Sequence, residues 1–217
     1  MTLAKLNTIA APYTSINGVA YASIAGFNGI AVPSAVTDAH TLLATATASA
    51  SSTLSFTSGI DSTYDVYEFR FENIHPANDA AFFTFQVNAD GLTGFDEFIT
   101  STQFDAYHHE TEGGTALGYR TTGDQAQTQL YQRITLDTGF DADQSVSGIL
   151  TLYAPSSPTY VKHFTANTNI SNADNNTVNS YTAGYINTTN AIDEISFKFS
   201  AGNIQAGQIK MYGIAKA

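Results

Sequence analysis

The segment His108-His109-Glu110 has the side chains best suited in this chain to bind a transition metal. Imidazole nitrogens and carboxylate oxygens are common zinc ligands, and a zinc site takes at least three protein ligands. On a strand, however, adjacent side chains point to opposite faces, so one ion would rarely reach both histidines. The sequence identifies no third ligand. We interpret the segment as part of a solvated polar loop, and we predict neither a metal site nor a cofactor.

A second group of possible cation ligands lies around Gly139, where Asp137, Asp141 and Asp143 supply carboxylate oxygens. Hard cations such as Ca²⁺ bind oxygen ligands in loops of this kind. The order of these residues does not match the twelve-residue calcium loop of an EF-hand. A solvated acidic loop is therefore the preferred interpretation, with a calcium site as the lesser alternative.

Paired carboxylates could support glycoside hydrolysis, in which one carboxyl group acts as an acid and the other as a base or nucleophile. The candidate pairs are Asp61 with Asp65 and Asp96 with Glu97. In a chain of formal net charge −11, acidic residues at strand ends more often serve only to solvate the protein. The sequence contains no Gly-x-Ser-x-Gly motif and no glycine-rich phosphate loop. We therefore predict no catalytic residues and no enzymatic activity.

Sugar binding is a more plausible chemistry for the polar loops. The candidate contact residues are Tyr107, His108, His109 and Tyr181, whose rings can stack on sugars or form hydrogen bonds with hydroxyl groups. The Asn-rich stretch 172–179 adds amide groups. Because the chain contains no tryptophan, this hypothesis is kept only as an alternative.

The segments that must position these residues alternate between apolar and polar side chains, as half-buried strands do. In segment 64–72, aromatic residues fall on one face and charged residues on the other: Tyr67, Phe69 and Phe71 against Glu68, Arg70 and Glu72. Segment 81–87 is a second strand, and the turn residues 75–79 predict that the two are a hairpin or neighbours. Further strands are predicted over 98–107, 117–120, 129–136, 146–153, 160–168, 180–186, 192–199 and 204–214.

About ten short strands without a long amphipathic helix predict an all-β protein, either a sandwich or a barrel. Long and uneven connections favour an antiparallel, jelly-roll-like β-sandwich over residues 51–217. Residues 35–43 could form a short helix or an extended segment, and residues 44–53 a linker or a plain edge strand. The strand order is not predicted.

Composition limits the classes of partner. The chain has 217 residues, enough for one domain and an appendage, and only 12% of them are charged. Its eight basic residues are scattered between Lys5 and Lys216, so we expect no nucleic acid to bind. The absence of cysteine excludes disulfides. No apolar run has the length of a signal peptide or a membrane span, and we expect a product released in the cytosol without a membrane partner.

The start of the chain contains an approximate repeat, SINGVA at residues 15–20 and GFNGIA at residues 26–31. The pairs Asn17-Gly18 and Asn28-Gly29 tolerate positive φ and so predict tight turns between extended segments. These segments are too short to build a core of their own. We predict an extended N-terminal arm and linker over residues 1–50 that folds on partner chains; packing on its own body is the alternative. The arm contacts are assigned to Ile16, Asn17, Gly18, Val19, Phe27, Asn28, Gly29 and Ile30.

Two parts of the chain resemble structural proteins of tailed-bacteriophage virions, particularly those of marine and cyanobacterial phages. The INGVA…FNGIA repeat is similar to the repeats that begin many phage structural and appendage proteins. The segments 56–67, 71–79, 147–155 and 207–214 resemble phage β modules that end in G-x-I-K-L-Y-G-I, with Met211 in place of the leucine. These motifs are structural, and the family offers no agreed active site to transfer.

The resemblance implies a non-enzymatic structural component of a phage virion, assembled in the host cytoplasm. We expect an outer-surface accessory protein of the capsid decoration or cement type, anchored through its arm. The alternative is a tail, collar or fibre protein whose β-sandwich binds host surface glycans. By analogy with phage accessory proteins, the expected partners are other copies in a trimer and virion proteins such as the major capsid protein or tail components.

Overall fold

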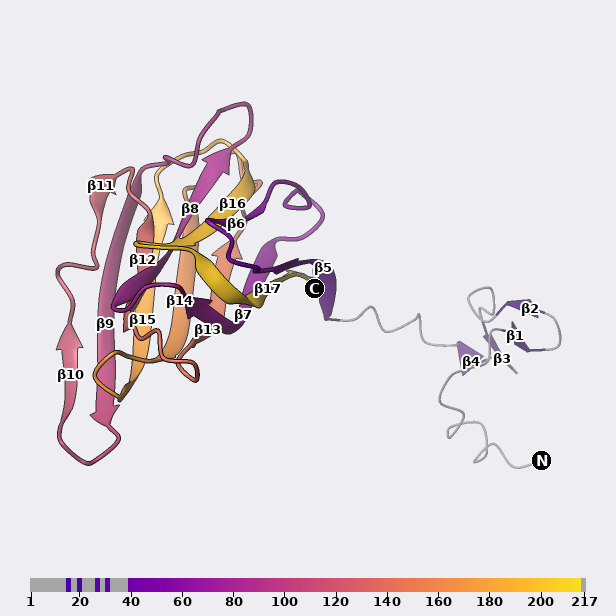
Figure 1. The fold of residues 1–217 in the computed structure, drawn as a ribbon. Coiled ribbons are helices and arrows are strands. Elements are labelled where there is room, and N and C mark those ends of the chain that lie inside the picture. Colours follow the sequence, from indigo (N-terminus) through magenta and orange to yellow (C-terminus); the bar gives the residue numbers. More distant parts are fainter. Residues whose placement is uncertain (1–14, 17–18, 21–25, 28–29, 32–38, 216–217) are drawn as a thin grey trace. The chain divides into compact units, whose positions relative to one another are not determined.

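The computed structural model describes residues 15–16, 19–20, 26–27, 30–31 and 39–215 (Figure 1). The chain divides into two compact units, Met1–Ala39 and His40–Ala217. The second unit begins before the boundary expected near residue 50, because strand β5 (His40–Thr47) pairs along β17 (Ile204–Ile214). Part of the expected linker is therefore an edge strand of the body.

The described residues of the first unit form two very short antiparallel strand pairs. Strand β1 (Ser15–Ile16) pairs antiparallel with β2 (Val19–Ala20), and β3 (Gly26–Phe27) pairs antiparallel with β4 (Ile30–Ala31). The antiparallel pairing of the strands on either side of each Asn-Gly pair agrees with the two predicted turns. The turn residues Asn17, Gly18, Asn28 and Gly29 lie outside the described residues. The contacts assigned to the arm remain a prediction.

The body is a sandwich of two antiparallel sheets, as the alternation of its side chains predicted. The larger sheet has nine strands: β5, β7 (Val66–Pro76), β9 (Ile99–His109), β10 (Thr115–Tyr119), β11 (Ala126–Thr128), β13 (Val146–Tyr153), β14 (Lys162–Ser171), β15 (Asn176–Ile186) and β17. The smaller has four: β6 (Leu54–Phe56), β8 (Ala81–Ala89), β12 (Gln132–Thr138) and β16 (Ile192–Phe199). The described residues include no helix long and apolar enough to cross a membrane.

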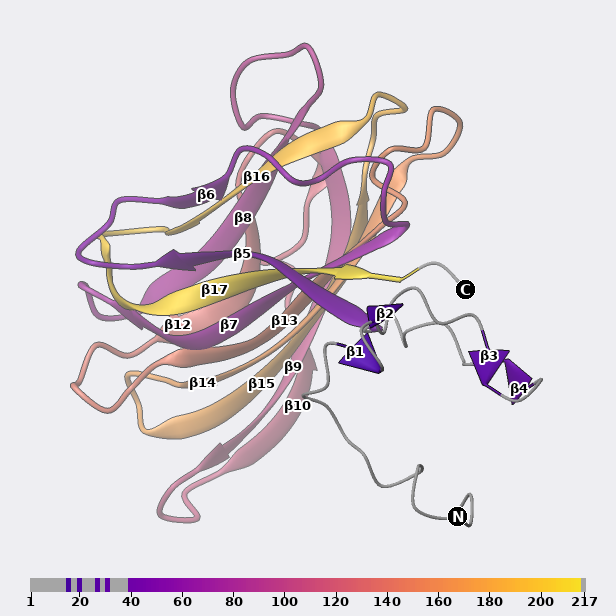
Figure 2. The same ribbon diagram turned by 90° about the vertical axis from the view of Figure 1, so that its right-hand side faces the viewer.

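Eight of these strands have the connectivity of a jelly roll. Strand β5 pairs with β17, β6 with β16, β7 with β13 and β8 with β12, so a long hairpin is folded over on itself. This gives the neighbour orders β5-β17-β7-β13 in one sheet and β6-β16-β8-β12 in the other (Figures 1 and 2). Four of the remaining strands, β14, β15, β9 and β10, continue the larger sheet beyond β13 and make it much wider than its partner, and β11 pairs with β9.

The prediction that segments 64–72 and 81–87 form a hairpin or neighbours in one sheet is wrong. Strand β7 belongs to the larger sheet and β8 to the smaller one. Their aromatic faces meet across the core instead, where the rings of Phe71 and Phe83 lie 5.2 Å apart and edge to face. Burying two aromatic faces against each other favours this placement over pairing the strands side by side.

The core of the sandwich centres on Phe197 of β16, which is fully buried. Its ring lies between 5.4 and 6.4 Å from four other phenylalanine rings, those of Phe69, Phe71, Phe83 and Phe85. The first two come from the larger sheet and the last two from the smaller one. This aromatic cluster therefore joins the two layers.

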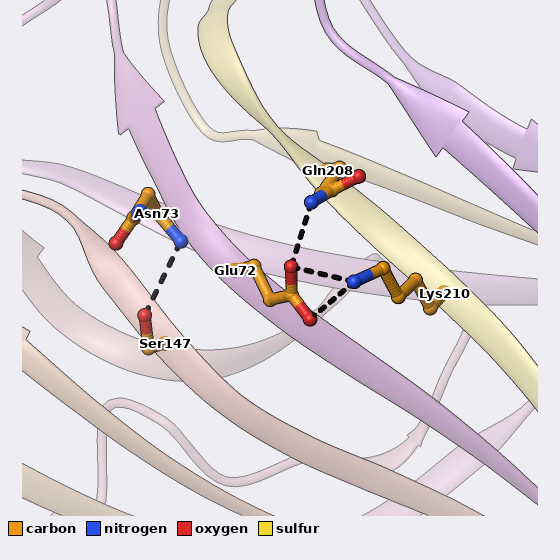
Figure 3. Close-up of polar contacts among 5 residues, drawn as sticks. All are labelled: Glu72, Asn73, Ser147, Gln208 and Lys210. Atoms are coloured by element: carbon orange, nitrogen blue, oxygen red, sulfur yellow. Dashed lines mark hydrogen bonds and ion pairs between the residues drawn. The ribbon is translucent and has the colours of Figure 1, made fainter.

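The outer face of the larger sheet carries its charges over β7 and β17. The Glu72 carboxylate accepts hydrogen bonds from the Lys210 Nζ at 2.7 Å and from the Gln208 Nε2 at 2.6 Å (Figure 3). The bond from Lys210 contributes most to lowering the pKa of Glu72. Beside this pair, Arg70 contacts Glu68 at 2.9 Å. These contacts balance charge at one side of the sheet.

Strand β7 has a bulge at Asn73, next to this charged region. Asn73 has φ of 50°, and its N–H donates to the Ser147 Oγ at 3.2 Å (Figure 3). Gly207 passes the bulge with φ of +105°, and a Cβ there would lie 2.4 Å from the Asn73 carbonyl oxygen. Only glycine fits this close approach of β17 to the bulge without strain.

Candidate functional site

The widened sheet overhangs its partner. Strand β12 is an edge of the smaller sheet and packs against β14 and β15. It meets β9 near Ser101, whose Oγ donates to the Gln132 Oε1 at 2.6 Å, so the later part of β9 and β10 extend beyond it. On the inner face of this overhang the buried side chains change from apolar to polar: Gln103, Asp105, Ser180 and Thr182 are all at most 2% exposed. Strands β9 and β15 therefore create a polar environment next to the aromatic core.

A cavity of about 370 Å³ opens on the inner face of the overhang. It lies between the β9–β10 hairpin, the β14–β15 hairpin and the end of β12. Its lining residues are Tyr107, His109, Gly113, Gly114, Arg120, Leu136, Asp137, Asn172, Asp174, Asn176 and Val178. We call this the overhang cavity. Its volume lies in the range of small-molecule sites.

An ion pair holds one wall of the overhang cavity. The side chain of Asp105 is completely buried, and its Oδ2 accepts a hydrogen bond from the Arg120 Nη2 at 2.8 Å. The Arg120 Nε also bonds to Asp105 Oδ1. Hydrogen bonding to Asp105 raises the pKa of Arg120 above its ordinary value. The bidentate geometry fixes the guanidinium group at the cavity and neutralises the buried carboxylate.

The β14–β15 hairpin is held by Asn172, which is 5% exposed. Its Oδ1 accepts hydrogen bonds from the Asp174 N–H at 3.1 Å, the Asn176 N–H at 2.8 Å and the Asn176 Nδ2 at 3.1 Å. Its backbone carbonyl accepts a bond from Gln144 Nε2 at 2.9 Å. Asp174 and Asn176 are therefore presented to the cavity by a braced turn.

Asp137 is the half-buried carboxylate of the overhang cavity. Burial raises its pKa, and the negative charge of Asp174 raises it further. A backbone hydrogen bond at Asp137 itself, the charge of Arg120 and a hydrogen bond from Asn172 offset this only in part. The ionised form of Asp137 therefore lowers the stability of the folded protein.

Replacing Asp137 with asparagine is expected to stabilise the protein at pH 7. The folded chain retains the Asp137 proton to a higher pH than the unfolded chain, so this group reduces stability as pH rises from about 3.9, the ordinary aspartate value, through the raised pKa. The asparagine variant does not lose stability in this way, because its side chain does not ionise. Near pH 3, where Asp137 is protonated in both states, the variant is no longer more stable than the original protein. Urea denaturation across this pH range measures it. An unchanged dependence of stability on pH in the variant would contradict the prediction.

A second hollow of about 450 Å³ lies on the opposite, outer face of the larger sheet. The side chains of Phe104 and Tyr181 form one wall, with parallel rings 5.1 Å apart. Threonine and asparagine side chains and Ile149 form much of the rest. We call this the outer groove. Its surface is largely apolar, unlike that of the overhang cavity.

The structure separates the four residues assigned to sugar contacts into two pairs. Tyr107 and His109 line the overhang cavity, and Tyr181 lines the outer groove. His108 is exposed on the outer face, opposite Thr177. The reason is that β9 runs through His109, so 108–109 are strand residues rather than the predicted loop, and neighbours alternate between faces.

The residues considered for cations and catalysis are distributed over separate places. Asp137 lines the overhang cavity, whereas Asp141 and Asp143 are exposed. Asp61 bonds to the Thr63 N–H at 2.7 Å, and the Glu97 Oε1 accepts a bond from the Ala89 N–H at 3.3 Å. Within the part of the chain that the structure describes, no group of three or more His, Asp or Glu residues could hold a metal ion.

Three charged residues of the overhang cavity and its wall were not found from the sequence: Asp105, Arg120 and Asp174. A signal for Asp105 exists in segment 98–107, where Gln103 and Asp105 occupy buried positions and Phe104 is exposed. In most half-buried strands the apolar side chains face the core, whereas here the polar side chains do so. The inner face of this strand is therefore polar. Arg120 and Asp174 carry no such signal, because only the folded sheet brings their loops together.

Comparison with known proteins adds no relative. No protein-family model, curated protein or solved structure matches this chain. Its function is therefore inferred from its own residues and geometry, together with the sequence resemblance described above.

Proposed function

We propose that this protein is a non-enzymatic structural component of a phage virion, an outer-surface accessory protein of the capsid decoration type that is anchored through its N-terminal arm. One observation carries the proposal. On β13, β14, β15, β9 and β10, all described by the structure, no outward-facing side chain is Asp, Glu, Lys or Arg. Large apolar side chains are exposed on this face: Phe104, Leu117, Tyr119, Ile149, Tyr153 and Tyr181. An exposed apolar face of this kind is typical of a protein contact surface.

The division of the chain into two units is consistent with this role. A short N-terminal unit, whose described residues form two strand pairs, precedes a jelly-roll body that carries its own core. Jelly rolls occur in viral capsid proteins and in lectins, although a fold by itself does not determine function. The arm would attach the body, and the body would occupy the surface of the particle.

Replacing both Asn17 and Asn28 with proline is expected to reduce incorporation into particles by about tenfold or more, the effect of losing 1.4 kcal/mol of contact energy. Proline fixes φ near −65°, whereas an Asn-Gly hairpin turn needs positive φ. The body should keep its circular dichroism spectrum and melting temperature. Mass spectrometry of purified particles measures incorporation, with Asn7→Pro, outside the repeat, as the control. Normal incorporation of the double variant would remove the arm from the proposal.

A tail, collar or fibre component that binds host glycans is the second candidate function. The overhang cavity favours it, because it brings Tyr107 and His109 together with Asn172 and Asn176, which are distant in sequence. The same particle measurement separates the two placements by copy number. Hundreds of copies per particle support decoration of the capsid, and a few dozen support a place in the tail.

A further inference from the structure

The polar groups of the overhang cavity are arranged to receive a ligand. Among the described residues, no hydrogen-bond partner occupies the hydroxyl of Tyr107 or the carboxylate of Asp174. The Asp137 carboxylate accepts hydrogen bonds from its own backbone and from Asn172, and a carboxylate can accept about four, so acceptor capacity remains. These three groups come from three different segments of the chain and line one recess. Convergence of polar groups with free hydrogen-bonding capacity in a recess is typical of a binding site.

The charges of the overhang cavity restrict the class of ligand. The described lining includes two basic residues, His109 and Arg120, and the charge of Arg120 is already matched by the buried Asp105. Asp137 and Asp174 are not matched in this way, so the cavity repels phosphate, sulfate and carboxylate groups. A ligand without negative charge is therefore favoured.

The remaining groups of the cavity fit a polyhydroxylated ligand. Carboxylates accept hydrogen bonds from hydroxyl groups, and the amide of Asn176 can donate as well as accept. The ring of Tyr107, together with Leu136 and Val178, supplies apolar surface. A sugar ring has this combination of edge hydroxyl groups and an apolar C–H face.

We propose that the overhang cavity binds one unit of a neutral saccharide, with its hydroxyl groups on Asp137, Asp174 and Asn176 and its ring against Tyr107. The inference rests on the second proposed function, a glycan-binding body, and does not depend on attachment through the arm. A half-buried carboxylate that lowers stability is also more readily explained by a role in binding than by a role in folding.

The test uses the full chain and a panel of neutral oligosaccharides of glucose, galactose and mannose, together with sialylated and uronic acid oligosaccharides and the polyamine spermidine. Isothermal titration calorimetry measures binding. At least one neutral oligosaccharide is expected to bind, and Asp137→Asn should weaken its affinity by about tenfold or more while raising stability at pH 7. Asp141→Asn, which changes an exposed carboxylate nearby, should bind normally.

A second pair of variants tests the cavity by filling it. A Cβ built on Gly114 meets no atom within 4 Å, and Gly114 lines the cavity, so Gly114→Leu should fold and weaken binding by about tenfold or more. Gly118 is equally unobstructed but does not line the cavity, and Gly118→Leu should bind normally.

Three results would overturn the inference: no binding by any neutral oligosaccharide, tighter binding of the anionic oligosaccharides or of spermidine, or equal losses in the matched control variants. Failure of binding with normal incorporation into particles would reject only the saccharide site. If the protein binds a neutral oligosaccharide but is not incorporated into particles, the virion proposal is rejected and the saccharide site stands.

Discussion

Phe197→Ala is expected to lower the free energy of unfolding by about 3–5 kcal/mol. The side chain is fully buried and contacts rings from both sheets, so its removal leaves a cavity between the layers. It also removes edge-to-face and stacked ring pairs that contribute beyond their buried area. Urea denaturation monitored by tyrosine fluorescence or circular dichroism measures the change.

Phe140→Ala is the matched control for this substitution, because the same side chain is 50% exposed there. It should change stability by no more than about 0.5 kcal/mol. Similar effects of the two substitutions would mean that the aromatic cluster does not join the layers. That outcome would contradict the packing described for the core.

Arg120→Ala is the second substitution with a large expected effect, a loss of about 3–5 kcal/mol of stability. It removes the guanidinium group and leaves the fully buried carboxylate of Asp105 without a cation. Arg70→Ala removes an arginine from a partly exposed pair with Glu68 on the outer face of the sheet, and it should cost at most about 1 kcal/mol. Denaturation of both variants under the same conditions gives the comparison.

Replacing both Arg120 and Asp105 shows whether the instability of Arg120→Ala comes from an unpaired buried charge or from lost packing. Arg120→Met combined with Asp105→Leu should recover most of the stability that Arg120→Ala loses, because no charge remains buried. If the double variant were as unstable as Arg120→Ala, loss of packing rather than an uncompensated charge would be the cause.

Most of the fold follows from the order of residues. The alternation around Tyr67, Phe69 and Phe71 predicted strand β7 and its buried face, and the segments around 146–153, 192–199 and 204–214 coincide with β13, β16 and β17. The alternation of apolar and polar residues does not show to which sheet a strand belongs. A strand with one buried face has the same sequence pattern in either sheet of a sandwich. The misplacement of β8 beside β7 has this origin.

The site was harder to predict than the fold for a related reason. Tyr107 and His109 were considered together with His108, yet the pleat of β9 sends His108 to the other face. Asp137 was considered with Asp141 and Asp143, but its neighbours in space are Arg120, Asn172 and Asp174. These residues lie close together because strands far apart in the chain pair with each other. Such long-range pairing cannot be predicted from the residue types of a short segment.

The pairing of β17 between β5 and β7 has a consequence for the order in which the protein is made. Strand β17 is synthesised after every other strand that the structure describes, yet it is the central neighbour of two strands made early. Until it leaves the ribosome, β5 and β7 lack that partner, and the body cannot close. Folding is therefore expected to follow synthesis and to be slow, as for other topologies dominated by contacts between distant residues. During that interval the unpaired edges of β5 and β7 are open to other chains, so the rate of synthesis and the local concentration of nascent protein decide between folding and aggregation.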